Sequence, residues 1–291
     1  MGYVVRGLAR EGSFRVFAVE CRDVVEEVRR LQGLSPTATA ALGRALAGAA
    51  LLAADLKTGR VMLQINGGGP LGEILAEGDA EGNLRGTVQH PEVHLEPREG
   101  KLAVGAAVGK NGFLSVARDL GLKEPYQGSV SLVSGEIAQD LAYYLTISEQ
   151  IPSAVALGVL VDVDGSVKEA GGFLVQRMPQ ADEEDIASAE KALSTLAPVT
   201  ELLSQGLSPE EILERIFPGR IEILERREVR YRCRCSRERV EAALAALGRE
   251  ELLELIAHGK PARVTCHFCG RGYEIPVEDL RRILAGLERP H

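Results

Sequence analysis

Four of the five cysteines in this 291-residue chain lie in two close pairs near its C-terminus. The pairs are Cys233-x-Cys235 and Cys266-x-x-Cys269, and thirty residues separate them. Four thiolates at such spacing complete a tetrahedral shell around Zn²⁺, which leaves no open position for a substrate water. The pattern therefore predicts a small domain held together by one structural zinc ion, and it argues against metal-dependent hydrolysis.

The other candidate residues carry weaker signals. His267 lies inside the second cysteine pair, but four thiolates do not need it, so we interpret it as a residue outside the metal shell. Cys21 stands alone and is most simply a small buried apolar side chain. Three short motifs resemble nucleotide or calcium loops but lack required residues: 67–70, 105–111 and 162–165. We therefore predict no catalytic residue and no organic cofactor, and we expect that the protein is not an enzyme.

Composition and the first residues predict a soluble, cytoplasmic protein. Hydrophobic residues make up 45% and charged residues 26% of the chain, as in ordinary globular domains. The start lacks the basic and apolar regions of a signal peptide, and in a reducing compartment paired cysteines indicate metal or redox chemistry. The apolar segment 36–56 contains Arg44 and Asp55 and begins at a Ser35-Pro36 cap. We therefore predict a buried helix there and no membrane partner.

The sequence predicts that residues 1–178 form an α+β core domain. A Glu11-Gly12 turn predicts a hairpin at its start, and no regular alternation of strands and helices follows, which argues against a doubly wound parallel sheet. Expected strands are 4–8, 14–19, 61–65, 86–89, 102–108, 128–133, 155–163 and 172–176, and expected helices are 24–31, 36–56 and 137–148.

After residue 178 the composition and the predicted secondary structure change twice along the chain. Residues 179–226 predict an acidic helical linker, in which Pro198 breaks a first helix and the capping box at 208–211 opens a second. Helices this short persist only when they pack against other structure. Residues 227–291 predict a small zinc-binding domain that contains the four cysteines and one helix, at about 238–257.

The charge distribution leaves two interpretations open for the linker. Residues 179–225 have 3 basic against 11 acidic residues, whereas residues 226–291 have 14 basic against 10 acidic residues. The two regions attract each other in a salt-dependent contact, or the acidic helices are simply solvated.

Two other functional classes also stay open on the residues alone. Seven arginines in 226–239 beside a zinc site are typical of some nucleic-acid-binding zinc ribbons, although the rest of the chain is acidic and poor in aromatic residues. Cys266-x-x-Cys269 on its own is compatible with a thiol–disulfide oxidoreductase, but such motifs usually begin a helix in a thioredoxin-like fold.

Taken together, several motifs resemble those of one known family. The segments are 231–239 and 264–270 around the cysteines, Tyr273, Asp279-Leu280, and further upstream 134–140, 148–152 and 170–172. They resemble the 33 kDa chaperonin family, the bacterial redox-regulated heat-shock holdases that work without ATP. The resemblance covers essentially the whole chain and is most specific at the cysteines.

This resemblance implies a switch. Cys233, Cys235, Cys266 and Cys269 would bind one zinc ion when reduced, and oxidation would form Cys233–Cys235 and Cys266–Cys269 disulfides. The partners would be unfolding client proteins, with a homodimer on activation and no nucleic acid. Cys21 receives no role.

Elementary energetics agrees with a switch of this kind. Structural zinc supplies about 10–16 kcal/mol of folding free energy, whereas disulfides closing loops of three and four residues return about 3–4 kcal/mol together. We therefore expect oxidation to unfold the C-terminal domain and the linker. The apolar surface exposed in this way would protect unfolding proteins from aggregation.

Overall fold

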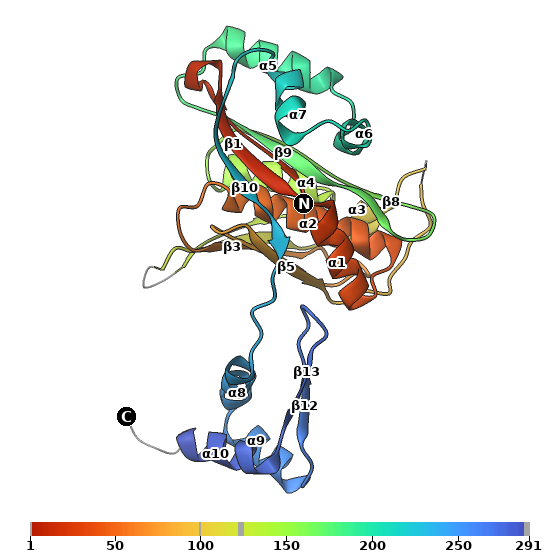
Figure 1. The fold of residues 1–291 in the computed structure, drawn as a ribbon, viewed down its shortest axis with the longest axis vertical. Coiled ribbons are helices and arrows are strands. Elements are labelled where there is room, and N and C mark those ends of the chain that lie inside the picture. Colours follow the sequence, from red (N-terminus) through yellow and green to blue (C-terminus); the bar gives the residue numbers. More distant parts are fainter. Residues whose placement is uncertain (1, 99, 122–124, 288–291) are drawn as a thin grey trace. The chain divides into compact units, whose positions relative to one another are not determined.

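The computed structural model describes residues 2–98, 100–121 and 125–287, and its chain forms two compact units, Met1–Arg232 and Cys233–His291 (Figure 1). Each unit combines helices with a sheet, so the predicted α+β class is confirmed. In the part of the chain that the structure describes, no helix is both long enough and apolar enough to span a bilayer.

Two mainly antiparallel sheets build the first unit (Figure 1). The five-stranded sheet has the order β10-β1-β2-β9-β8, with bounds β1 (Tyr3–Ala9), β2 (Phe14–Glu20), β8 (Ser153–Val161), β9 (Val167–Arg177) and β10 (Ile221–Glu228). The six-stranded sheet has the order β11-β5-β4-β3-β6-β7, with bounds β3 (Arg60–Asn66), β4 (Ile74–Asp79), β5 (Asn83–Val88), β6 (Phe113–Asp119), β7 (Tyr126–Ser131) and β11 (Arg230–Tyr231).

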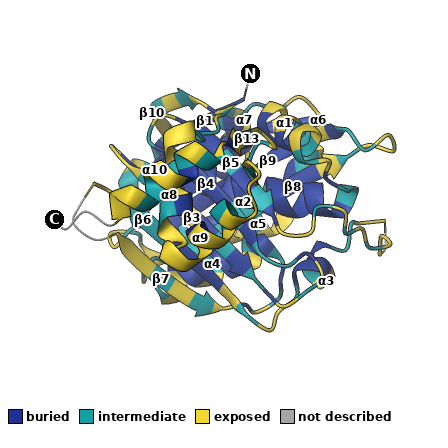
Figure 2. Ribbon diagram, turned by 90° about the horizontal axis from the view of Figure 1, so that it is seen from below, coloured by how far each residue is buried: buried dark blue, intermediate teal, exposed yellow. Residues whose placement is uncertain are grey.

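The helix α2 (Pro36–Ala53) packs against both sheets and forms the centre of the first unit (Figures 1 and 2). All of its residues except Pro36 and Arg44 are buried, and its many alanines and glycines let the sheets approach closely. At Gly43, for example, an added Cβ would lie 2.7 Å from a methyl group of Val159. Arg44 forms a 2.6 Å ion pair with Glu136, which explains how a charge is accommodated in this apolar helix. The prediction of a buried helix is confirmed.

Three further helices complete this part of the unit: α1 (Arg22–Gln32), α3 (Val104–Val108) and α4 (Ile137–Ile147). The residues of α3 were predicted as a strand, and that prediction was wrong. A short apolar run does not distinguish a strand from a buried helix, and here the run packs against α2.

The acidic segment forms three short helices, α5 (Glu183–Thr195), α6 (Val199–Ser204) and α7 (Pro209–Ile216). They cover one face of the five-stranded sheet, where their apolar side chains form a second core cluster with the sheet (Figure 1). The predicted break at Pro198 and the capping box between Ser208 and Glu211 are both confirmed. Residues 221–226 had been assigned to this helical linker, but with residues 227 and 228 they form the strand β10, which was not predicted.

Polar contacts tie the start of α5 to the turn between β1 and β2. Asp185 accepts hydrogen bonds from Ser13 at 2.7 Å and from Arg10 at 2.6 Å, and Arg10 also donates to Ser188 at 2.5 Å. The hydrogen bonds from Ser13 and Arg10 hold the pKa of Asp185 below its usual value of 3.8. A depressed carboxyl pKa stabilises the folded state above the unfolded pKa, and this contribution is lost as the pH falls through the folded value.

We therefore expect α5 to loosen on acidification before the rest of the first unit. Hydrogen–deuterium exchange in α5, corrected for the intrinsic rate, should rise as the pH falls from about 4 to about 2, because the Asp185 carboxylate, whose folded-state pKa lies below 3.8, takes up its proton only there. The variant Asp185→Asn should show faster exchange at both pH values and a smaller change between them. An unchanged pH response in this variant would exclude Asp185 as the responsible group.

The second unit is small. It contains α8 (Arg237–Ala246), α9 (Arg249–Ala257), the hairpin β12 (Ala262–Thr265) and β13 (Gly272–Ile275), and α10 (Val277–Leu287). One helix had been predicted over 238–257, but Gly248 adopts a φ of +98° and separates α8 from α9. The buried core of the described part consists of five apolar side chains, and the helices carry long exposed stretches (Figure 2). The five buried core residues are Val240, Leu244, Leu252, Ile275 and Leu280. A core of this size supplies only a few kcal/mol.

Candidate metal centre

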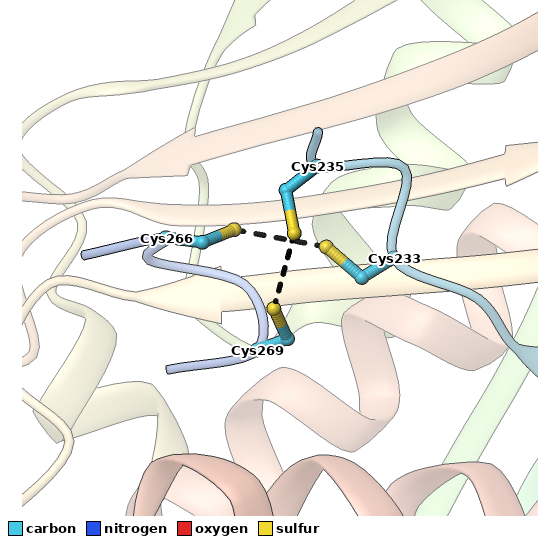
Figure 3. Close-up of side chains that lie close together, drawn as sticks. All are labelled: Cys233, Cys235, Cys266 and Cys269. Atoms are coloured by element: carbon cyan, nitrogen blue, oxygen red, sulfur yellow. Dashed lines mark hydrogen bonds between the residues drawn. The ribbon is translucent and has the colours of Figure 1, made fainter. Parts of the chain in front are cut away.

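The four paired cysteines converge in the second unit (Figure 3). Their sulfur atoms all lie within 4.8 Å of one another, with 3.6 Å between Cys233 and Cys266 and 3.5 Å between Cys235 and Cys269. A tetrahedral metal with four sulfur ligands at 2.3 Å requires sulfur–sulfur separations of about 3.8 Å. The cluster therefore has the donor atoms and dimensions to hold a metal ion such as zinc.

Two separate segments position these side chains. Cys266 and Cys269 lie on the turn between β12 and β13, where the Gly270 N–H donates to the Cys266 carbonyl at 2.8 Å. Cys233 and Cys235 come directly before α8, whose N-cap Ser236 accepts a hydrogen bond from the backbone of Arg239. A metal ion bound by all four sulfurs would fasten the start of α8 to the hairpin.

The surroundings favour negative charge on one sulfur in particular. The Tyr273 hydroxyl donates to the Cys235 sulfur at 3.1 Å. Burial raises the pKa of Cys235, but hydrogen bonds from Tyr273 and from the other three cysteines outweigh burial and lower that pKa to about 7. Burial raises the pKa of Cys269 to about 12 and also raises the pKa of Cys233. In the metal-free cluster, Cys235 is therefore ready to be a thiolate, and a bound cation would be needed to hold the others in that form.

The contact between Tyr273 and Cys235 was not predicted from the sequence. Its hydroxyl reaches Cys235 because the β12–β13 register places Tyr273 opposite Val264, beside the cysteine turn. No spacing rule in the sequence relates Tyr273 to Cys235, so this contact depends on the hairpin register.

The other candidate residues lie where the sequence suggested. His267 is exposed, and the potential ligand group consists of the four sulfurs. Cys21 is fully buried in the first unit, and burial raises the pKa of its thiol. The Cys266–Cys269 motif lies on a hairpin turn and does not begin a helix, which argues against a thioredoxin-like active site.

Comparisons with known proteins agree with this architecture. Residues 2–276 match the family model described as Hsp33 protein. The 33 kDa chaperonin of Geobacter sulfurreducens is 50% identical over 283 residues, which cover 97% of this chain and 94% of the relative. The protein of the same name from Bacillus subtilis is 45% identical over 282 residues, 96% of this chain and 97% of the relative.

A solved structure shows the same fold. The crystal structure of the 33 kDa chaperonin from Thermotoga maritima, described as a heat shock protein 33 homolog, superposes with a TM-score of 0.89. It is 42% identical in sequence, and the match covers 98% of each chain. The names of these relatives support a chaperone role, and the match along nearly the whole length shows that this chain belongs to the Hsp33 family.

Proposed function

We propose that this protein is a redox-regulated, ATP-independent holdase of the cytoplasm. In the reduced state, Cys233, Cys235, Cys266 and Cys269 hold one Zn²⁺ and the protein is inactive. On oxidation it releases zinc and binds unfolding client proteins, as a homodimer. The observation that carries the proposal is the four-sulfur cluster, which joins two segments of a unit whose own core is very small.

The stability of the second unit depends on this cluster. Five buried apolar side chains stabilise a unit of about 60 residues by only a few kcal/mol. Zinc bound by four thiolates contributes about 10–16 kcal/mol to folding. Loss of the metal therefore leaves a unit that is unstable at physiological temperature.

Which disulfides form decides whether oxidation opens or locks the unit. The cross pairs Cys233–Cys266 and Cys235–Cys269 would keep the two segments joined, and each would close a loop of about 34 residues, worth about 4 kcal/mol. We propose instead the neighbouring pairs, Cys233–Cys235 and Cys266–Cys269. Each peroxide takes two electrons from two thiolates and, with two protons from the solvent, leaves as two waters, so that two peroxides convert the cluster to two disulfides. The joined segments then separate.

Unfolding of the second unit would next affect the segment 179–226, which we propose acts as the linker between a core domain, 1–178, and a switch domain, 227–291. Its helices α5–α7 bury Leu213 and Phe217 against the five-stranded sheet. The strands β10 and β11 join α7 to Cys233, so disorder after residue 233 removes the support at one end of this segment. Once the helices leave, the apolar sheet face becomes a surface for unfolded polypeptides.

The test is light scattering from a thermally unfolding client protein. The protein is added either reduced and zinc-loaded or after peroxide at elevated temperature, and zinc release and disulfide pairing are measured in the same samples. We expect suppression of aggregation only after oxidation, together with zinc release and the two neighbouring disulfides. Release of zinc without protection of the client would make the site merely structural, and cross-paired disulfides would contradict the opening mechanism.

A further inference from the structure

One continuous segment covers an edge of both sheets in the first unit. β10 is the outermost strand of the five-stranded sheet, antiparallel to β1 (Figure 1). β11 is the outermost strand of the six-stranded sheet and runs parallel to β5. Only Val229 separates the two strands, and it is buried and donates its N–H to Gly2 at 3.0 Å. We call residues 221–232 the edge clasp. Arg232 is directly followed by Cys233.

The edge clasp is held by backbone pairing and by polar side-chain contacts, such as Arg226 over the Tyr3 ring and Arg230 to Asn83 at 2.9 Å. Ile223 and Leu224 are 39% and 46% exposed, and most other side chains of β10 are charged. In β11, the Arg230 N–H donates to the carbonyl of Gly82, just before β5, at 3.0 Å, and the N–H of Arg232, which follows β11, donates to the Leu84 carbonyl of β5 at 2.9 Å. Ile221 and Tyr231 are only partly buried, and Val229 is the one fully buried apolar side chain of the described clasp, so its removal forfeits limited hydrophobic stabilisation.

Unlike the clasp, the neighbouring strand β1 is anchored by buried apolar side chains on both of its faces. In β1, Val5 and Ala9 belong to the cluster under α5–α7, whereas Val4 belongs to the cluster between the two sheets. β1 is also paired along its whole length with β2, so it remains in place when the clasp leaves. Its other edge would then present a row of unpaired backbone N–H and C=O groups.

The pairing of the clasp with β1 is already irregular. The register shifts between Arg6 and Gly7, and an added Cβ at Gly7 would lie 2.6 Å from the Glu222 carbonyl oxygen. A bulge interrupts the ladder of hydrogen bonds and weakens pairing locally. The clasp is therefore a strand that can be replaced by one of better fit.

We propose that the bare edge of β1 binds an extended segment of an unfolding client as an added antiparallel strand. This inference rests on the proposed function, because oxidation must first free the clasp. Strand addition uses main-chain hydrogen bonds, which every polypeptide offers, and therefore needs no particular client sequence. Alternate side chains of the added strand would lie beside Val5 and Ala9 on the face that α5–α7 vacate. The partner is thus an extended, apolar, strand-forming segment.

A disulfide across β1 and β10 tests the proposal. Arg6 and Glu225 are directly opposed, with 3.7 Å between Arg6 Nε and a Glu225 carboxylate oxygen, so Arg6→Cys and Glu225→Cys can bridge the strands. The bridge is formed while zinc protects the native cysteines, and the protein is then oxidised. We expect zinc release and unfolding of residues 233–291 as in the unlocked protein, but at least a tenfold higher concentration needed to protect a client.

A matched lock elsewhere controls for the extra disulfide. Met62 and Ala117 are opposed on β3 and β6, away from the clasp, and Met62 is exposed. The variant Met62→Cys with Ala117→Cys should protect clients like the unlocked protein. Equal protection by the Arg6–Glu225 lock would overturn the proposal. Failure of the unlocked protein to release zinc or protect a client would instead refute the proposed function.

Competing peptides give a second, independent readout on the unmodified oxidised protein. A strand-forming peptide of alternating valine and threonine should displace the client, and its twin with N-methyl groups on alternate residues should compete at least tenfold more weakly. The twin keeps its side chains but loses hydrogen bonding along one edge. Equal competition by the two peptides would overturn strand addition.

Discussion

The variant Phe217→Ala should protect clients in the reduced, zinc-loaded state, in which the proposed switch keeps the unchanged protein inactive. Phe217 is fully buried at the end of α7, and its ring lies 5.0 Å from that of Phe14 in the five-stranded sheet. Truncation of a buried phenylalanine lowers the free energy of unfolding by about 3–5 kcal/mol. Here it weakens the packing of α7 against the sheet. The helices should therefore undock without oxidation, while zinc stays bound.

Hydrogen–deuterium exchange identifies the segment that opens, and light scattering measures protection of the client. We expect faster exchange across 183–216 and unchanged exchange across 233–287. Phe17→Ala is the matched control, since Phe17 is equally buried but packs in the cluster between the two sheets. Phe113→Ala, at an exposed phenylalanine, controls for the substitution itself. Equal activation by Phe17→Ala would show that general destabilisation, and not release of α5–α7, exposes the client-binding surface.

The features that could be predicted from the sequence are those whose causes are local. The Ser208 capping box and the break at Pro198 depend on residues within one helical turn, and both are found as expected. The convergence of the cysteines followed from their chemistry, because two close pairs of thiols in one small domain have few other uses. Local chemistry was thus sufficient for these features.

Most of the features that were missed depend on distant partners. β10 has a charged sequence without clear alternation and becomes a strand only because β1, more than 200 residues earlier, offers its edge. The same holds for Tyr273, whose contact with Cys235 requires the β12–β13 register. The helix break at Gly248 required knowing that this glycine adopts a positive φ, which its position inside a helical pattern did not reveal. Pairing and register are properties of the fold, so the edge clasp could not be seen in the sequence.

The variant Cys269→Ser should abolish tight zinc binding and unfold the second unit even under reducing conditions. Three sulfurs would remain, and a serine hydroxyl is a poor replacement for a thiolate as a zinc ligand. If the cluster holds zinc as proposed, the metal contributes about 10–16 kcal/mol and the remaining core only a few, so the loss exceeds what the unit can tolerate. We expect zinc content to fall from one ion per chain to nearly none, with exchange protection lost across 233–287 and retained in the six-stranded sheet.

The variant His267→Ala is a control that distinguishes the loss of the metal from a change in the turn that carries the cysteines. His267 lies on the same hairpin turn, two residues before Cys269, but is exposed and outside the sulfur cluster, so its variant should keep zinc and a protected second unit. If the proposed switch is correct, reduced Cys269→Ser also protects clients without any oxidant, because the support that zinc gives to residues after 233 is already gone. A Cys269→Ser protein that keeps a folded second unit would show that its small core, and not the four-sulfur cluster, holds it together. Redox control of client binding through these cysteines would then have no structural basis.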